Sequence, residues 1–211
     1  MEASSSSRIN TDNSIASKET AINTSPNFEI NTPISPYLQK HIIKSIAQNL
    51  KDIIKENIHN NQMKYVKHDI FYISRLPPIS LEDYINRIFK NTKMNISSLI
   101  LSIIYIDRFC ENYGYILSLK NIHRIFLTAC RLSIKFNEDI NVSTKYYSNI
   151  AGITVQDLNN LEIYLIVNLE FSLFVESDIY QKYFEYFCKF NTNDNKKTED
   201  NSIKTKFKSS K

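Results

Sequence analysis

The stretch from Asn95 to Asp139 constrains the fold more than any other part of the sequence. Its apolar periodicity predicts two helices joined by a turn at Tyr113-Gly-Tyr115. In the first helix, from Ile96 to Phe109, apolar residues recur every three or four positions and cover more than half of the circumference. That breadth indicates a helix buried on most sides, because a surface helix shows a narrower apolar stripe.

The second predicted helix runs from Ser118 to Phe136 and carries apolar and small residues that let another helix approach closely. Three charged residues lie inside this hydrophobic pair of helices: Asp107, Arg108 and Lys135. A charge in such surroundings needs a partner. We therefore take these three residues as the first candidates for a specific role.

Glycine is scarce, since the chain has 2, and both Gly114 and Gly152 fall at predicted helix ends. Phosphate cradles need several glycines close together, so no nucleotide-binding loop is available. No GxSxG or HExxH signature and no CxxC pair occurs, and the four histidines lie far apart in the sequence. We expect no enzyme activity, no cofactor, no metal site and no small-molecule ligand.

Composition narrows the remaining classes. A chain of 211 residues with 42% hydrophobic content can bury the core of one ordinary domain. The net charge of +4 is too small to argue for nucleic acid by itself. No run approaches the roughly 20 apolar residues of a membrane span, and the three isolated cysteines are typical of a reducing compartment. We expect a soluble protein of the cytoplasm and nucleus.

The chain divides into four predicted regions. Residues 1–36 are rich in Ser, Asn and Thr and are expected to be disordered, as is the basic tail at 191–211. Residues 37–76 hold a helix from Tyr37 and a linker. The apolar face of that helix can pack on the domain, bind a partner or lie on an anionic membrane, and packing is the favoured interpretation.

Residues 77–190 form the main domain, which is predicted to be all helical. Ser80 with Asp83, and Thr154 with Asp157, have the spacing of capping boxes that begin two helices. We expect an all-α bundle in which five short helices surround the helix from Ile96 to Phe109. The surrounding helices are predicted at 80–92, 118–136, 143–150, 154–169 and 177–190. The fourth carries its apolar stripe on Val155, Leu158, Leu161, Leu165 and Leu169.

Three motifs resemble the cyclin box, in the order and nearly the spacing of that family. They are Ile104-Tyr-Ile-Asp-Arg-Phe109, then Leu132-Ser-Ile-Lys-Phe136 followed by Glu138 and Asp139, and finally Leu161-Glu162. Other segments resemble the P-type or U-type group, named for the yeast phosphate-response cyclin. These are Pro77-Pro-Ile-Ser80, Ser118-Leu-Lys-Asn-Ile-His-Arg124 and Tyr147-Ser-Asn-Ile-Ala-Gly-Ile153.

The resemblance covers about Pro77 to Phe190 and implies a single five-helix cyclin fold with an additional N-terminal helix and disordered tails. It also implies a regulatory subunit. Cyclins bind a cyclin-dependent serine/threonine kinase and position its C-helix and activation segment, in cell-cycle control or nutrient signalling. Many cyclins carry a second helical repeat, whereas only a polar tail follows Phe190, so this chain resembles a single-repeat cyclin.

In the family pattern, a lysine at the end of the third helix and a glutamate in the fifth form a charged pair that contacts the kinase. Lys135 and Glu162 match those positions. From the residues alone, a bridge that only joins two helices is the favoured alternative, while the resemblance favours contact with the kinase.

Asp107 and Arg108 are interpreted as structural. In many cyclins the matching aspartate is buried against an arginine at the start of the first helix, where this chain has Pro78. We therefore expect Arg87 or a helix N-terminus as the partner of Asp107. The hydrophobic docking patch of cell-cycle cyclins lies at the same helix start and is replaced here by Leu76-Pro-Pro-Ile79, which argues against substrate docking of that kind.

Two other functions stay open. One is a cyclin-fold scaffold that binds a protein without activating it. The other is a transcription-related helical module that binds nucleic acid through basic residues of the tail. Those residues are Lys196, Lys197, Lys204, Lys206 and Lys208.

Overall fold

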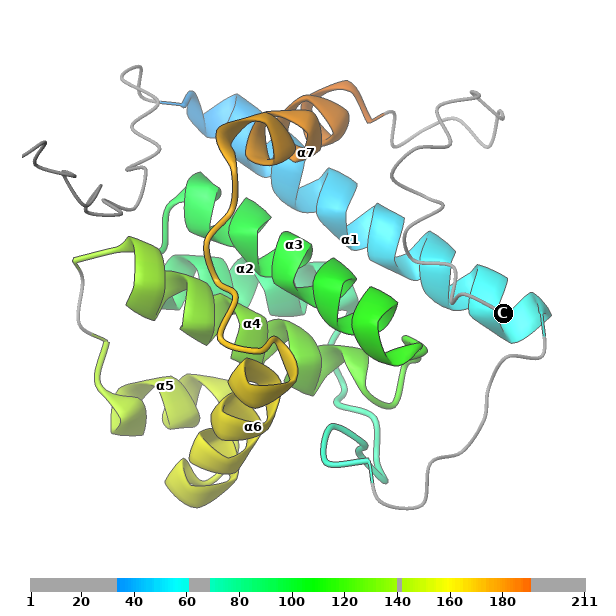
Figure 1. The fold of residues 1–211 in the computed structure, drawn as a ribbon, viewed down its shortest axis with the longest axis vertical. Helices are drawn as coiled ribbons and strands as arrows, with labels where there is room; N and C mark the ends of the chain where they lie inside the picture. Colours follow the sequence, from blue (N-terminus) through cyan, green and yellow to red (C-terminus); the bar gives the residue numbers. More distant parts are fainter. Residues whose placement is uncertain (1–33, 61–68, 140–141, 191–211) are drawn as a thin grey trace, which may run out of the picture.

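The computed structural model describes residues 34–60, 69–139 and 142–190, so nearly all of the segments predicted to be disordered lie outside the described residues. The described residues form seven helices and no strand, which confirms the all-α prediction (Figure 1). The helices are α1 (Pro36–His59), α2 (Leu81–Thr92), α3 (Ile96–Tyr113), α4 (Ile122–Asn137), α5 (Thr144–Ala151), α6 (Val155–Asn168) and α7 (Ser177–Lys189).

Side chains cap the helices where the sequence predicted starts. Ser80 Oγ accepts a hydrogen bond from the Asp83 amide at 3.1 Å, and Thr154 Oγ1 accepts one from the Asp157 amide at 3.0 Å. α4 begins at Ile122, later than the predicted Ser118. The difference arises because Asn121 Oδ1 accepts a bond from the Ser118 amide at 2.8 Å and closes a turn before the helix.

α3 lies in the middle of the molecule, with α1 and α7 on one side and α4 on the other (Figure 1). Every residue from Ile96 to Asp107 is buried, as the broad apolar pattern predicted. α4 packs along α3, and its small residues Ala129, Cys130 and Ser133 are fully buried. Small side chains there let the two helices approach closely.

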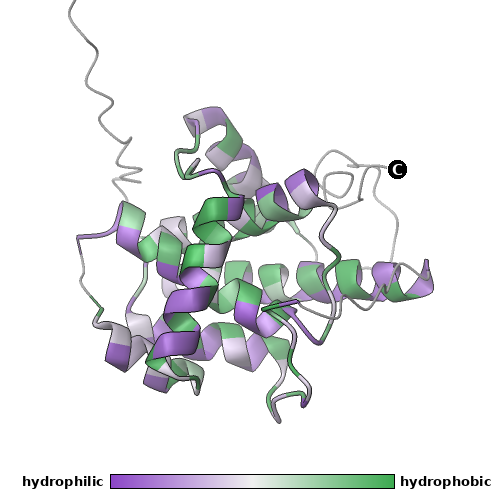
Figure 2. Cartoon of the chain, turned by 60° about the horizontal axis from the view of Figure 1, so that its bottom comes forward, coloured by the Kyte–Doolittle hydropathy of each residue, from purple (hydrophilic) through white to green (hydrophobic). Residues whose placement is uncertain are grey.

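α1 packs on α2 and α7, so the packing interpretation of its apolar face is confirmed. Ile42, Ile46 and Leu50 are fully buried, whereas Lys44 is exposed. Figure 2 shows hydrophobic and hydrophilic residues alternating along this helix, which is the pattern of a half-buried helix. Of the seven described helices, none combines the length and hydrophobicity needed to cross a bilayer.

Candidate functional site

Three charged side chains from α4 and α6 meet at the edge of the bundle. Glu162 Oε2 accepts a hydrogen bond from Arg131 Nε at 2.5 Å, and Glu162 Oε1 accepts one from Lys135 Nζ. Arg131 and Lys135 stand one helical turn apart, so α4 presents both on one face. We call these three residues the charged triad. The structure thus brings together Lys135 and Glu162, the two residues matched to the cyclin pair.

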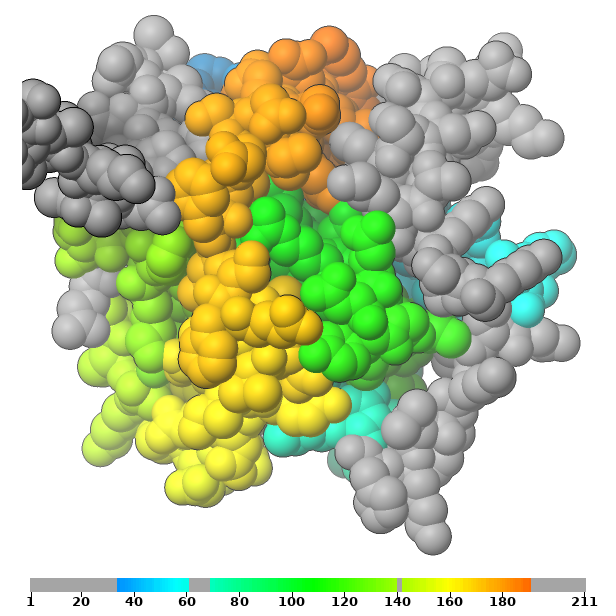
Figure 3. Space-filling model, in the orientation of Figure 1, coloured from blue at the N-terminus to red at the C-terminus, as the bar shows by residue number. Residues whose placement is uncertain are grey.

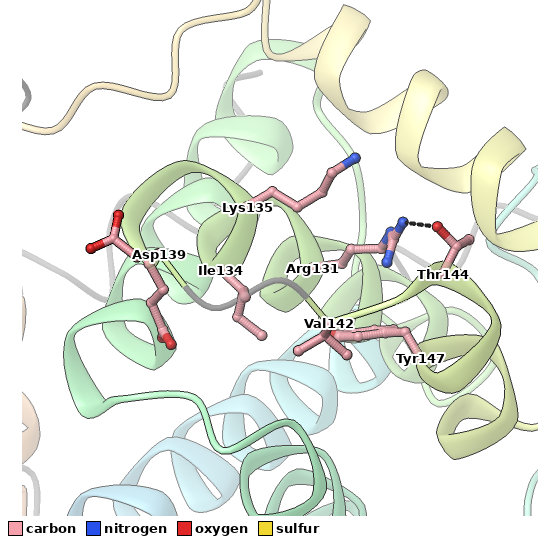
Figure 4. A pocket seen from close by; sticks show the side chains of 8 residues that line it. Arg131, Ile134, Lys135, Asp139, Val142, Thr144 and Tyr147 are labelled. Atoms are coloured by element: carbon pink, nitrogen blue, oxygen red, sulfur yellow. Dashed lines mark hydrogen bonds between the residues drawn. The ribbon is translucent and has the colours of Figure 1, made fainter.

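The two cations of the charged triad occupy different environments. The Arg131 side chain is 5% exposed, whereas the Lys135 side chain is 55% exposed. Arg131 also donates from Nη2 to Thr144 Oγ1 at 2.8 Å, and its guanidinium lies over the Tyr147 ring at 5.4 Å (Figure 4). Arg131 is therefore held on three sides and fixes Glu162, while Lys135 is available at the surface.

The sequence analysis missed Arg131. It lies in the apolar stripe of α4, four residues before Lys135, and it is 4% exposed in the structure. A cation at that spacing, on the same face as the residue matched to a charged pair, was a usable signal. A buried charge is retained only when it is paired and hydrogen-bonded, and Glu162 is its ion-pair partner.

A hollow of about 270 Å³ opens beside the charged triad, at the end of α4 and the start of α5 (Figure 4). Its lining mixes charged and apolar side chains: Arg131, Ile134, Lys135, Glu138, Asp139, Val142, Thr144 and Tyr147. Glu138 also caps α3, because its Oε1 accepts a hydrogen bond from the Asn95 amide at 2.9 Å. The described residues contain no group of three potential metal ligands.

α6 exposes apolar side chains next to Glu162. Ile163 is 61% exposed and Val167 is 51% exposed, and beyond the helix Phe171 and Phe174 are 67% and 41% exposed. We call these four residues the apolar face. Figure 3 shows α6 and the segment after it at the surface beside α3. Several large exposed apolar side chains in one stretch of 12 residues are typical of a surface that binds another protein.

Phe171 has an unusual backbone. Its φ is +57°, and that of the preceding Glu170 is +51°, in the left-handed region that bulky residues rarely adopt. The conformation is fixed by hydrogen bonds at the end of α6, where the Phe171 amide donates to the Ile166 carbonyl at 3.0 Å. The result is a strained residue that presents its aromatic ring to solvent.

Arg108 and Tyr105 of α3 hold the segment that follows α6. Arg108 Nη1 donates to the carbonyls of Ser172 and Phe174, both at 2.9 Å. Tyr105 Oη donates to the Leu173 carbonyl at 2.8 Å. These bonds hold the backbone of residues 172–174 against α3, next to Phe171 and up to Phe174 of the apolar face.

Asp107 lies away from the charged triad, on the side of α3 that faces α7. It is 2% exposed, and its Oδ2 accepts a hydrogen bond from the hydroxyl of Tyr183 in α7, whereas we expected Arg87 or a helix N-terminus as its partner. Burial raises the pKa of Tyr183, and the nearby Asp107 carboxylate raises it further, so the phenol stays a donor. The three charges that the sequence placed inside one helix pair therefore serve separate contacts.

Comparisons with known proteins agree with this architecture. The family model for cyclins matches residues 2–173. Cyclin-U2-1 of Arabidopsis thaliana is 31% identical over 147 residues, which is 69% of this chain and 64% of the relative. Cyclin-P3-1 of Oryza sativa subsp. japonica is 30% identical over 114 residues, which is 54% of this chain and 48% of the relative.

The yeast protein PHO85 cyclin-7 of Saccharomyces cerevisiae is 30% identical over 132 residues, which is 57% of this chain and 46% of the relative. This chain therefore spans about half to two thirds of the length of the curated relatives it matches. With its all-helical fold and the family match over most of its length, this chain belongs to the cyclin family, whose members are regulatory subunits and not enzymes themselves.

Proposed function

We propose that this chain binds a cyclin-dependent serine/threonine kinase and activates it. Membership of the cyclin family supports the proposal, and one structural observation carries it: in α6, Glu162 of the charged triad is followed directly by Ile163, the first residue of the apolar face. Apolar side chains supply most of the affinity of a protein interface, and charges at its edge fix register and orientation. This surface offers both within one helix and the segment that follows it.

The partner element is the C-helix of the kinase. An amphipathic helix laid along α6 would cover Ile163, Val167 and Phe171 and bring a polar side chain to Lys135. The ammonium of Lys135 has three donors, and its recorded ion pair with Glu162 uses one of them. The charged triad carries two cations and one anion, so a carboxylate of the partner fits best at Lys135.

Activation follows from holding that helix in one position. An active kinase needs the glutamate of its C-helix paired with the lysine that contacts the ATP phosphates. To move such an equilibrium from almost fully inactive to almost fully active, the cyclin must bind the active state better by about 5.5 kcal/mol. The chain contributes no catalytic group in this mechanism and acts only by differential binding.

The test is affinity purification with candidate cyclin-dependent kinases, followed by a phosphorylation assay. Lys135→Ala should weaken kinase binding about tenfold. Ile163→Asp should weaken it about a hundredfold, because the carboxylate would be desolvated against the partner helix. Lys182→Ala is the matched control, since Lys182 is 66% exposed on α7 and forms only an ion pair within its own helix.

The outcomes separate the alternatives. Recovery of a kinase with no gain in phosphorylation would favour the scaffold function. Equal recovery by wild type, Lys135→Ala and Ile163→Asp would exclude the proposed surface. DNA binding with a steep salt dependence, lost on removal of 191–211, would favour the nucleic-acid function, whose basic residues lie outside the described part of the chain.

A further inference from the structure

Proline follows a hydroxyl residue three times within a short stretch near the beginning of the chain. The chain has 5 prolines, and the remaining two, Pro77 and Pro78, follow a leucine and a proline. Ser35 alone of the three hydroxyl residues lies within the described part of the chain. We call the three residues the Ser/Thr-Pro cluster. They are Ser25 before Pro26, Thr32 before Pro33 and Ser35 before Pro36.

Ser35 is exposed and begins α1. Its Oγ accepts a hydrogen bond from the Leu38 amide at 3.2 Å, and Pro36 is the first residue of the helix. Because Oγ is the acceptor in that bond, its own proton takes no part in it. The backbone of Ser35 is extended, with φ −58° and ψ 146°, as expected for a residue before proline. An exposed hydroxyl on an extended backbone is what a protein kinase requires of its acceptor residue.

The two residues after Ser35 are also open to an enzyme. Pro36 is exposed, and Tyr37 is 83% exposed. Ile34 and Leu38, on either side of these three positions, are partly buried and pack against the core. The first turn of a helix opens at a low cost in free energy. The segment around Ser35 can therefore enter a substrate groove while the rest of α1 stays packed.

The proline after each hydroxyl indicates the class of enzyme. Proline has no backbone N–H, and its ring fixes φ. A kinase groove that offers no acceptor to the residue after the target would leave the amide of any other residue buried and unpaired. Such a groove selects proline at that position. Kinases with this preference are the proline-directed serine/threonine kinases.

A phosphate on Ser35 would stabilise the start of α1. Phosphoserine carries nearly two negative charges at neutral pH, and the first turn of a helix presents the positive end of its dipole. The first turn of α1 contains no acidic residue, and the first carboxylate along the helix is that of Asp52. Within α1, the phosphate would therefore have no carboxylate near it in sequence.

We propose that the Ser/Thr-Pro cluster is a phosphorylation site for a proline-directed serine/threonine kinase, with Ser35 as an acceptor at the start of α1. In the reaction, Ser35 Oγ forms a bond to the γ-phosphorus of ATP, and the bond from that phosphorus to the bridging oxygen breaks. ADP leaves, and the hydroxyl proton passes to the catalytic aspartate of the kinase. This chain is the substrate in that step, whether or not it also activates a kinase through the charged triad.

The first experiment incubates the full chain with ATP and a purified kinase of the mitogen-activated class, which selects proline after its acceptor. Mass spectrometry of the peptides locates the phosphate, which we expect on the three residues of the Ser/Thr-Pro cluster. Ser80 and Ser143 are internal controls, because both are exposed and cap a helix as Ser35 does. Neither precedes proline, so both should stay unmodified.

Two proline variants test the selection. Pro36→Ala keeps the Ser35 hydroxyl and should lower its phosphorylation about tenfold, because the new amide is left unpaired in the groove. Phosphorylation of Ser25 and Thr32 should not change. Pro78→Ala alters an exposed proline that follows no hydroxyl residue and should leave the phosphorylation of all three acceptors as it is.

A thermal melt tests the placement of the phosphate. In the double variant Ser25→Ala with Thr32→Ala, Ser35 is the one acceptor left in the cluster. Its phosphorylated form should melt about 1–3 °C higher than its unmodified form. Added salt should reduce that difference. Ser35→Ala should melt lower than wild type, because the cap on the Leu38 amide is lost.

The last measurement is peptide mass spectrometry of the chain isolated from the cells that express it, which should find phosphate at Ser35. Three results would overturn the proposal: phosphate on Ser80 or Ser143 at the level of Ser35, undiminished phosphorylation of Pro36→Ala, or no phosphate on the cluster in the cellular protein. A lower melting temperature of the phosphorylated form would contradict its place at the start of α1. Lys135→Ala changes none of these outcomes, so this proposal and the kinase contact can fail separately.

Discussion

At the scale of single residues, Arg131 is the member of the charged triad whose loss should cost the most stability. Arg131→Met should lower the free energy of unfolding by about 2–4 kcal/mol, because Glu162 loses its buried partner. Lys135→Ala should lower it by less than about 1 kcal/mol, since that side chain is more than half exposed. Urea denaturation of the two variants checks the difference, and equal losses would contradict the assigned roles.

Phe171 should lower the stability of the fold and strengthen the proposed binding of the kinase. Phe171→Asn keeps a residue that tolerates the left-handed region and should raise the free energy of unfolding by about 0.5–1 kcal/mol. The same change removes an exposed ring from the apolar face and should weaken kinase binding. Phe174→Ala, at a residue without positive φ, should weaken binding with no gain in stability. A thermal melt beside a binding assay separates the two effects.

His123 should make stability depend on pH. Burial against Tyr84 lowers the pKa of His123 below 6.5, and the Leu119 carbonyl partly opposes that shift. Below pH 6.5 the unfolded chain binds a proton that the folded chain takes up only at lower pH. Stability from this residue is therefore full above pH 6.5 and falls as the pH drops toward the folded pKa.

His123→Phe keeps the aromatic contact and removes the titration. The loss of stability between pH 7.5 and pH 5.5, measured by urea denaturation, should be smaller in the variant than in wild type by up to about 1 kcal/mol. Carboxylates titrate equally in both proteins, so the difference isolates the histidine. A difference of the opposite sign would show that the folded chain binds the proton more tightly.

At the scale of helices, α3 and α6 are both rich in apolar residues and serve different purposes. Ile103→Ala, at a fully buried position of α3, should cost about 2–5 kcal/mol of unfolding free energy. Val167→Ala, at an exposed position of α6, should change stability by less than about 0.5 kcal/mol and weaken kinase binding. If both variants lost similar stability, the apolar face would be part of the core.

Helices with one clear pattern were predictable from the sequence. α3 is apolar around most of its circumference, and the structure buries it as expected. α6 was harder, because it is apolar on two sides. The predicted stripe included Val155, which is 40% exposed, and the periodicity did not single out Ile163 or Val167. Periodicity cannot distinguish an apolar helix face that packs on the core from an apolar helix face that is exposed at the surface.

Contacts between distant elements were the least predictable. Asp107 accepts a hydrogen bond from Tyr183, which lies 76 positions further along the chain. No local sequence pattern encodes that pairing. Lys135 and Glu162 were found because family motifs fixed their spacing. Arg131 lay between the motifs, inside a stripe that periodicity assigned to packing. Two residues of the charged triad, Lys135 and Glu162, were therefore predictable from the sequence, and Arg131 was not.

At the scale of the whole molecule, charged side chains tie both ends of α4 to other elements. Its C-terminal half carries Arg131 and Lys135, which both pair with Glu162 of α6. At the other end, Arg124 and Lys120, which lies just before the helix, bond to the backbone carbonyls of Ile70 and Ser74. Because α4 is also buried along α3, neither set of contacts can shift without disturbing the core. The charged triad is therefore held at a fixed place on the bundle.

The bonds from Tyr105 and Arg108 to the segment after α6 end on main-chain oxygens of Ser172, Leu173 and Phe174. Every amino acid supplies such an oxygen, so the course of that strand-like stretch is independent of the side chains it displays. Sequence can drift at its outward positions while its shape persists. Evolution can in this way change the side chains that meet a partner while the backbone beneath them keeps its course.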